Sequence, residues 1–525
     1  MHTTAQLIDG AVLPARRTGP VTTGRPRTWL RFGVADVLML VLAIGILQRS
    51  QGSMLDDPGL GWHIRNVDAM LAEGAWLSAD PFSGPQGGRA WLANQWLGDL
   101  LLYFGWHWGG LEGIAVLTTC VLALTFRWLY QMLVTDGVAW PLAIAWTFLG
   151  ALATSISWVA RPNIFTLLFV MVTAWTLDRY YRGAGTRRQT LWLIPLMAVW
   201  ANTHGGFVAG LLIIAAALLL ECGLAALPRV AKVIAPARNR EADHHSRVRH
   251  LALLLVGAVL ATLLNPYSWH LYPWIFQLLG DPFFMNLHTE WLSPNFHEAG
   301  ALRYECLILA LPLLLAFSRR RAVSLLALLL SLLWLHFALG GARYIALWVV
   351  ITVPLLARLS QDLCTRYLGG RGSALPLPGT FRREGFAGVL LIGLSLLVWA
   401  RWTDGYSRHD PSRLPTAALA HVVGNFPGQV VFHNYGWGGW LTWHGWPQVK
   451  NWIDDRNEVQ GQQHIEQYFQ IMQARPGWED LLRAGGVQVA CLPVAAPLTA
   501  VLAERPDWVE RYRDEYAAVY QRNEP

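Results

Sequence analysis

The sequence is poor in charged side chains. Only 14% of its 525 residues are Asp, Glu, Lys or Arg, and 54% are hydrophobic, whereas soluble chains carry about 25% charged residues. A soluble protein of this length would need charged surface for two or more domains. Nearly uncharged runs such as 205–220 and 322–339 have the length of a helix that crosses a bilayer, about 17–25 residues. We therefore predict a polytopic α-helical membrane protein and exclude a soluble or fibrous one.

Several common catalytic and structural motifs are also missing. The five cysteines are scattered without a CxxC pair, which argues against a disulfide framework or a zinc knuckle. GxSxG, HExxH and Walker A motifs do not occur, so triad hydrolysis, zincin proteolysis and ATP-driven transport have no support. The first 33 residues are basic and lack the apolar core of a signal peptide. We expect the first apolar span to anchor the chain.

Basic residues indicate how the spans are oriented. The net charge is +7, and Lys and Arg gather in alternate loops, as they do on the cytoplasmic side of membrane proteins. This asymmetry favours a cytoplasmic segment at 1–33 and about eleven transmembrane helices within 34–402. The predicted spans are 34–49, 111–132, 139–158, 162–181, 190–203, 206–226, 250–265, 301–317, 322–340, 343–358 and 386–402.

Two large regions then lie outside the cytoplasm. The first is an outer loop at 50–110, in which the aromatic segment 95–108 reads as an interfacial helix or a half-span. The second is the tail 403–525, which we predict to be a small extracytoplasmic α/β domain. Strands are expected at 429–435 and 487–493 and a helix at 496–505. The C-terminal end fits either a hairpin or a strand followed by a helix.

The remaining polar residues gather on the outer side. Ionisable groups at a membrane are costly and often functional, so their convergence suggests one polar cavity at the outer leaflet. A carboxylate there can act as a general base, and arginines can hold a phosphate. The candidates are Asp56, Asp57, His63, Arg161, Asn202, His204, Asn265, Tyr267, Glu290, Arg343 and Tyr344.

Each candidate also has a structural explanation. Asp57-Pro58 and Asn265-Pro266 suit simple turns, and a single histidine such as His63 is more often a satisfied buried side chain. Glu290 can form a structural ion pair with a nearby basic residue such as Arg303. The arginines can reach outward to lipid phosphates.

The motifs around these residues resemble those of bacterial multispanning GT-C-type proteins. This group is akin to the dolichyl-phosphate-mannose mannosyltransferase and lipid A aminoarabinose transferase types. The similar stretches are DPGLGWH (57–63), DPFS (80–83), WLANQW (91–96), ARPNIFTLLF (160–169), WANTHGGFVAG (200–210), LLNPYSWHLY (263–272), TEWLSPNF (289–296), ARYIALWVV (342–350), FHNYGWGGWLTW (432–443) and NWIDDRNEV (451–459).

The resemblance implies an essential acidic residue just after the first span and a polyprenyl-phosphate sugar as donor. By position this role falls on Asp57, with Asp56 as its neighbour and Asp80 as a second acidic candidate. Relatives often carry another Asp two residues after the first, where this chain has Gly59, and the paired DE signature is missing. A divalent cation is possible, with Asp56, Asp57 and His63 as conceivable ligands, but the spacing does not decide it.

The leading hypothesis is an inverting glycosyltransferase of a bacterial inner membrane that moves a sugar from a polyprenyl-phosphate donor to an extracytoplasmic glycan, lipid or protein. Asp57 would be the base, Arg343 and Arg161 would hold the phosphate, and His204, Asn202 and Glu290 would shape the sugar pocket. The run GWGGWLTWHGW (436–446) would cap the cavity or form a packed core. The alternatives are a lipid-linked glycan flippase and a non-catalytic scaffold of a polysaccharide assembly complex. Membrane lipids are expected partners and nucleic acid is not.

Overall fold

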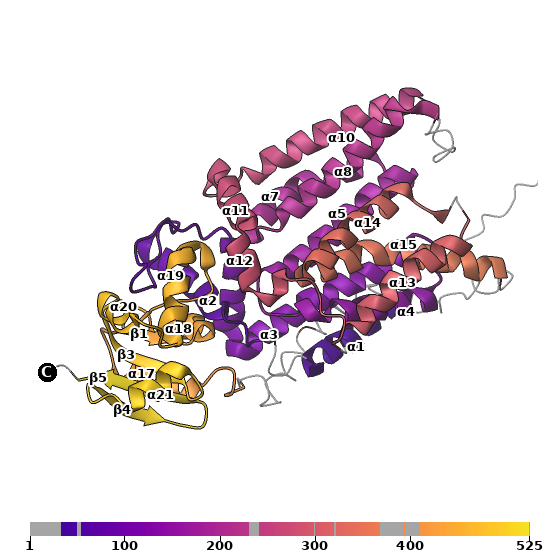
Figure 1. The fold of residues 1–525 in the computed structure, drawn as a ribbon. Helices are drawn as coiled ribbons and strands as arrows, with labels where there is room; N and C mark the ends of the chain where they lie inside the picture. The colour runs from indigo at the N-terminus through magenta and orange to yellow at the C-terminus, as the bar shows by residue number, and fades with distance from the viewer. Residues whose placement is uncertain are drawn as a thin grey trace, which may run out of the picture.

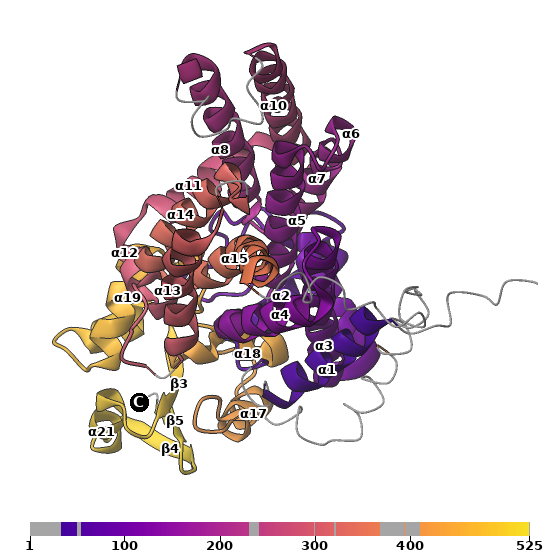
Figure 2. The same cartoon turned by 90° about the vertical axis from the view of Figure 1, so that its right-hand side faces the viewer.

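The structure is a computed structural model that describes residues 33–49, 54–229, 241–298, 300–319, 322–367, 393 and 410–523. It consists of a helical bundle and a smaller α/β part that contains the C-terminal residues (Figures 1 and 2). The main bundle helices are α1 (Val34–Arg49), α3 (Trp96–Thr135), α4 (Trp140–Thr154), α5 (Asn163–Arg182), α7 (Leu193–Thr203), α8 (Phe207–Ala226), α10 (Glu241–Thr262), α13 (Leu302–Phe317), α14 (Leu325–Gly340) and α15 (Ile345–Tyr367).

Shorter helices connect the bundle helices. They are α2 (Leu60–Glu73), α6 (Arg187–Thr190), α11 (Leu271–Gly280) and α12 (Pro282–Leu287), with the 3-10 turns η2 (Ser155–Ser157), η4 (Ser268–His270), η5 (Thr289–Trp291) and η7 (Ala342–Tyr344).

The predicted spans coincide with helices wherever the structure describes them. The eleventh, 386–402, lies outside the described residues. Three described helices are long and apolar enough to cross a membrane: α3, α8, and the run Ala342–Tyr367 that joins η7 to α15. The count of about eleven crossings therefore stays a prediction, while the helical membrane class agrees with these apolar helices.

The segment 95–108 is the first part of α3. The helix bends at Gly110, whose φ of 63° and ψ of −148° are non-helical, and this conformation strongly favours glycine. After the bend the chain turns back on itself. The backbones of Gly105 and Gly113 lie so close together that a methyl group on either residue would crowd the other. The predicted boundary between the interfacial segment and the next span falls at this bend.

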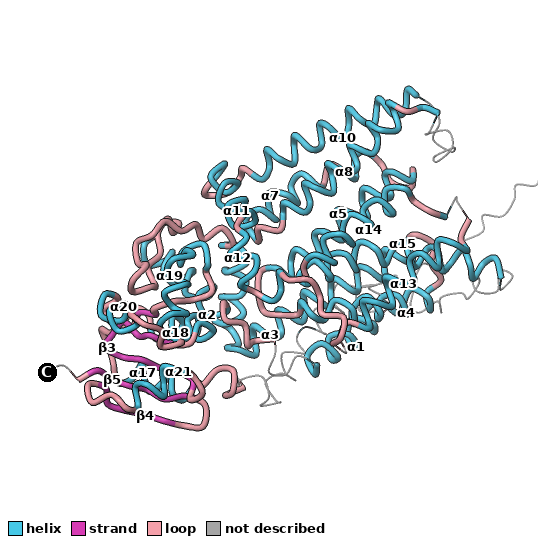
Figure 3. Tube along the Cα trace, in the orientation of Figure 1, coloured by secondary structure: helices cyan, strands magenta, loops and turns pink. Residues whose placement is uncertain are grey.

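The α/β part contains one five-stranded sheet in the order β2-β1-β3-β5-β4. β1 pairs in parallel with β2 and β3, and β5 pairs antiparallel with β3 and β4. Figure 3 shows the described strands together at one end of the molecule. The elements are α17 (Thr416–Asn425), β1 (Val430–His433), η9 (Tyr435–Trp437), α18 (Gly438–Gly445), β2 (Lys450–Asn451), α19 (Asn457–Met472), α20 (Trp478–Ala484), β3 (Val487–Pro493), α21 (Pro497–Ala503), β4 (Trp508–Arg513) and β5 (Ala517–Arg522).

The sequence-based expectations for the tail are confirmed at the level of its elements. The two expected strands are β1 and β3, the expected helix is α21, and the C-terminal end is the hairpin β4–β5. Within the run 436–446, Trp437 and Trp443 are buried, which favours a packed core over an exposed binding surface for these two side chains. The predicted boundary at 402/403 lies outside the described residues.

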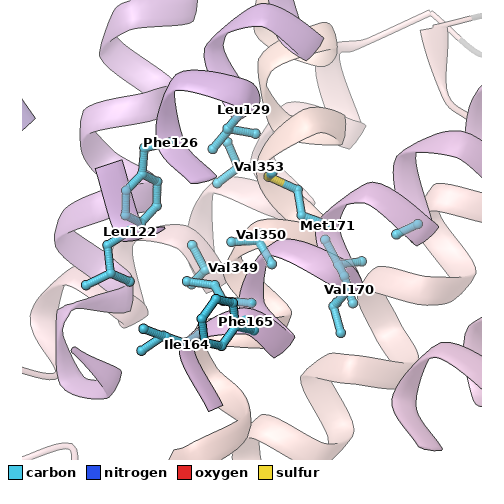
Figure 4. Packing of buried hydrophobic residues seen from close by; sticks show 14 of the residues in the cluster. Leu122, Phe126, Leu129, Ile164, Phe165, Val170, Met171, Val349, Val350 and Val353 are labelled. Atoms are coloured by element: carbon cyan, nitrogen blue, oxygen red, sulfur yellow. The ribbon is translucent and has the colours of Figure 1, made fainter. Parts of the chain in front are cut away.

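The bundle core forms where α3, α5 and α15 meet. Figure 4 shows this packing of aliphatic and aromatic side chains. The labelled residues are Leu122, Phe126 and Leu129 of α3, Ile164, Phe165, Val170 and Met171 of α5, and Val349, Val350 and Val353 of α15, all of them buried.

Small residues bring the first loop against the α/β part. A methyl group on Gly61 of α2 would overlap the carbonyl oxygen of Gly439 in α18, and one on Gly439 would overlap that of Pro58. Ser83 also forms a parallel bridge with Asn451 of β2. The loop after α1 is therefore held between the bundle and the C-terminal sheet.

Candidate active site

Charged residues from five separate chain segments meet at the end of the bundle next to the α/β part. Asp57 precedes α2, and Arg161 lies in the turn before α5. Glu290 lies in η5 and Arg343 in η7, while Asp455 follows β2. We call these five residues the Arg161 cluster.

Arg161 is at the centre of this cluster. Its Nε forms a short ion pair with Oδ2 of Asp57, and its Nη1 lies 3.7 Å from Oε2 of Glu290. Its Nη2 lies 3.6 Å from Oδ2 of Asp455. The Asp57 and Asp455 side chains are only 5% and 9% exposed, so these charges interact more strongly than they would in water.

Arg343 extends the cluster on the side of Glu290. Its Nη1 lies 3.4 Å from Oε1 of Glu290, and its guanidinium carbon lies 3.8 Å from the ring centroid of Trp291. The Tyr344 ring packs edge-on against Trp291 at 6.2 Å. Glu290 thus bridges the guanidinium groups of Arg161 and Arg343. Arg303, which the sequence suggested as a structural partner of Glu290, donates a hydrogen bond to Ser155.

The charged side chains of the cluster shift one another's pKa values. Burial would raise the pKa of Glu290, but Arg343 and Arg161 outweigh it and hold that pKa below its ordinary value. Burial would lower the pKa of Arg161, but Asp57, Asp455 and Glu290 raise it instead. Burial raises the pKa of Asp455, with added repulsion from Asp57 and Asp454 that Arg161 only partly offsets. The cluster therefore lowers the pKa of one carboxyl group, Glu290, and raises that of another, Asp455.

His63 is not part of this cluster. Its Nδ1 lies 2.6 Å from Oδ1 of Asp99, and the other oxygen of Asp99 accepts a hydrogen bond of 2.8 Å from Asn66. Both partners are buried, so the explanation as a satisfied histidine fits. Asp56 is half-buried, and the carboxylate that contacts Arg161 belongs to Asp57. Within the described part of the chain, no three His, Cys, Asp or Glu side chains are placed to hold a metal ion.

Asp80, the second acidic candidate from the sequence, lies in a different buried network. Its Oδ1 lies 2.8 Å from Nη1 of Arg456, and both side chains are fully buried. Arg456 also pairs with Asp454 and lies over the rings of Phe82 and Trp91 at 5.1 and 4.6 Å. This network joins the first loop to the C-terminal part. We call Asp80, Asp454 and Arg456 the Arg456 network.

Asn202 and Asn265 have structural partners. Oδ1 of Asn202 accepts from the Trp96 indole at 2.7 Å, and its Nδ2 donates to two backbone carbonyls. Asn265 forms a turn at the end of α10, where its Oδ1 accepts from the backbone N–H of Tyr267 at 2.8 Å. The hydroxyl of Tyr267 donates to the carbonyl of Leu77. The turn explanation therefore holds for Asn265.

His204 lies near the cluster and is neutral. Its Nδ1 accepts from the backbone N–H of Gly206 at 2.9 Å and lies 2.9 Å from Oγ1 of Thr166. Burial, aided by the charge of Arg343, lowers the pKa of His204 to about 3. A neutral ring of this kind can donate one hydrogen bond from Nε2.

Sequence reasoning missed the contribution of the tail. Asp454, Asp455 and Arg456 belong to the stretch NWIDDRNEV, which carried part of the resemblance but received no role. An acidic pair after a short apolar stretch was the available signal. The signal did not show what this pair contacts. The indole of Trp62 donates a hydrogen bond to Oδ1 of Asp455 at 2.8 Å, although the two residues are 393 positions apart in the sequence.

Comparison with known proteins identifies the fold class. No family model and no curated protein matches the chain. The structure is similar to the oligosaccharyltransferase AglB of Archaeoglobus fulgidus in complex with an inhibitory peptide and a dolichol-phosphate. The TM-score is 0.55, with 12% identity over 88% of this chain and 69% of that one.

A second AglB structure, tethered to an acceptor peptide, gives a TM-score of 0.54 at 13% identity over 93% of this chain and 74% of that one. ArnT of Cupriavidus metallidurans gives 0.49 at 14% identity, over 92% of this chain and 97% of that one. The two oligosaccharyltransferase structures show that the chain has the fold of the GT-C glycosyltransferases.

Proposed function

We propose that the protein is an inverting glycosyltransferase of a bacterial inner membrane. It takes a sugar from a polyprenyl-phosphate donor and transfers it to an extracytoplasmic glycan, lipid or protein. The observation that carries this proposal is the Arg161 cluster, in which two guanidinium groups and buried carboxylates meet at one end of a GT-C fold. The AglB structure with dolichol-phosphate supports a lipid-phosphate donor.

The reaction requires a base and a stabilised leaving group. The acceptor oxygen bonds to the anomeric carbon while the bond from that carbon to the phosphate oxygen breaks, and the electron pair leaves with the polyprenyl phosphate. A carboxylate of the Arg161 cluster, for which the sequence predicts Asp57, takes the acceptor proton. A positioned base of this kind typically contributes about 10²–10⁴-fold in rate.

Arg343 is the side chain best suited to receive the donor phosphate. Its contact with Glu290 is long, at 3.4 Å, and its other contact is the face of Trp291. Arginine binds phosphate through a planar pair of donors, so a phosphate can replace Glu290 at modest cost. Arg161 is held more tightly, by its short ion pair with Asp57, and adds positive charge near the phosphate.

The test measures transfer by the purified protein in lipid nanodiscs. A panel of labelled polyprenyl-phosphate sugars is offered with hydroxyl acceptors, and released polyprenyl phosphate is quantified. At a donor concentration below KM, we expect Asp57→Asn and Arg343→Met to lower transfer about 100-fold or more. Asp68→Asn is the matched control, because its carboxylate pairs with Arg65 at the surface of the same first loop.

The outcomes separate the candidate functions. Full activity of Asp57→Asn would eliminate Asp57 from the reaction. A wild-type protein that moves the intact lipid across the bilayer without cleaving it would favour the flippase. A wild-type protein that neither cleaves nor moves any donor would favour the scaffold.

A further inference from the structure

Gly59 leaves room for two carboxylates to approach the same point. A methyl group on this residue would lie 3.0 Å from Oδ2 of Asp455 and 3.1 Å from Oδ1 of Asp57. It would also lie 3.1 Å from Nε1 of Trp62. The missing Cβ therefore allows an acidic side chain from the C-terminal part to reach the acidic residue of the first loop.

The two carboxylates are held in different ways. Both oxygens of Asp57 are engaged, Oδ2 by Arg161 and Oδ1 by the backbone N–H of Gly59 at 2.8 Å. Asp455 accepts one hydrogen bond, at Oδ1 from Trp62. Its Oδ2 lies 3.6 Å from Arg161, which is too long for a hydrogen bond. Among the four carboxylate oxygens of Asp57 and Asp455, Oδ2 of Asp455 is therefore the one that accepts no hydrogen bond from the described residues.

We infer that Asp455 accepts the proton of the acceptor hydroxyl and that Asp57 is a positioning residue that holds Arg161. This inference rests on the proposed glycosyl transfer and changes only the identity of the base. The acceptor O–H bond breaks, its proton goes to Oδ2 of Asp455, and the new bond forms between the acceptor oxygen and the anomeric carbon. Polyprenyl phosphate leaves with the electron pair of the broken bond.

The surroundings of Asp455 suit a base. The charged and titratable groups around it are Arg161 from the bundle, Asp57 from the first loop, and Asp454, Glu458 and Tyr435 from the α/β part. Burial and the neighbouring carboxylates raise the pKa of Asp455 against the opposing effect of Arg161. A base whose pKa lies closer to the working pH takes a proton more effectively.

The first test separates chemistry from donor binding. Transfer from one accepted polyprenyl-phosphate sugar is measured over a range of donor concentrations for wild type, Asp455→Asn, Asp455→Glu and Asp57→Asn. We expect Asp455→Asn to lower kcat about 10²–10⁴-fold with the KM for donor changed less than threefold. Asp455→Glu should recover part of the activity, and Asp57→Asn should mainly raise the KM for donor.

The pH profile gives a readout that a structural role would not move. Trp62→Phe removes a hydrogen bond to the ionised form of Asp455, so the acidic limb of kcat/KM should shift to higher pH. Glu458→Gln is the control, because it removes the neighbouring titratable carboxyl; a limb that belongs to Asp455 should be retained and should not move to higher pH. Equal thermal stability of the variants confirms that they fold.

A kcat for Asp455→Asn within threefold of wild type would overturn the inference while leaving the glycosyltransferase intact. An acidic limb that disappears with Glu458→Gln and does not move with Trp62→Phe would also overturn it. A wild-type protein without any transfer would contradict both proposals.

Discussion

Replacing Arg456 by Met is expected to destabilise the junction between the first loop and the C-terminal part. Met keeps the apolar stem between the rings of Phe82 and Trp91 but removes the charge that compensates two buried carboxylates. Arg456, Asp80 and Asp454 have side chains that are 0% exposed. Removing one partner of a buried pair typically costs about 3–5 kcal/mol, because the other charge stays buried without compensation.

This loss is large enough to measure as a shift in melting temperature. For a domain slightly above 100 residues, such as the C-terminal part described over 410–523, 1 kcal/mol corresponds to roughly 4 °C. The variant should therefore melt at least about 10 °C lower. The assay uses Cys491, which is buried in β3. With the other four cysteines replaced by serine, a thiol-reactive dye reports the unfolding of the sheet in detergent.

The matched control is Arg505→Met. Arg505 pairs with Asp507 and Glu479 with its side chain 36% exposed, and surface pairs of this kind contribute about 0–1 kcal/mol. Replacing Asp80 and Asp454 by Asn in the Arg456→Met background should restore part of the stability, since no buried charge then stays unpaired. Equal melting of Arg456→Met and Arg505→Met would refute the argument.

Two further predictions concern packing and pH. Gly439→Ala should displace α18 from Pro58 and lower the melting temperature in the same dye assay, whereas Gly424→Ala, where the added methyl group meets no neighbour, should not. Burial raises the pKa of Glu458 to about 7, so its stabilising protonated form is present at low pH and is lost as the pH rises through about 7. Wild type should therefore lose up to about 3 kcal/mol between pH 5 and 8, and Glu458→Gln should flatten that dependence; parallel stability curves for the two proteins would contradict it.

The helices could be predicted from sequence because each bundle helix contains an apolar run. α10 shows the limit of this reasoning. The predicted span begins at 250, whereas the helix begins at Glu241, because a helix continues through polar residues beyond the apolar run that identifies it. At α3 the predicted boundary is confirmed, since the two segments treated separately meet at the bend at Gly110.

Four members of the Arg161 cluster were predictable as well. Asp57, Arg161, Glu290 and Arg343 each lie in a turn that the basic-residue pattern assigns to the outer side. The predicted alternation of the spans brings such turns to one end of a bundle. Asp455 was not predictable in this way. Its position depends on how the C-terminal sheet packs against the first loop, and no local pattern encodes a contact between residues 393 positions apart.

The position of Asp455 follows from its two neighbours in sequence. Asp454 and Arg456 are both fully buried in the Arg456 network, which is tied to the first loop through Asp80. Asp455, between them, instead reaches Trp62 and Arg161. The same three residues therefore join the C-terminal part to the first loop and deliver a carboxylate to the Arg161 cluster. In a chain with so few charges, the buried ion pairs far from the proposed chemistry are what keep Asp455 within reach of it.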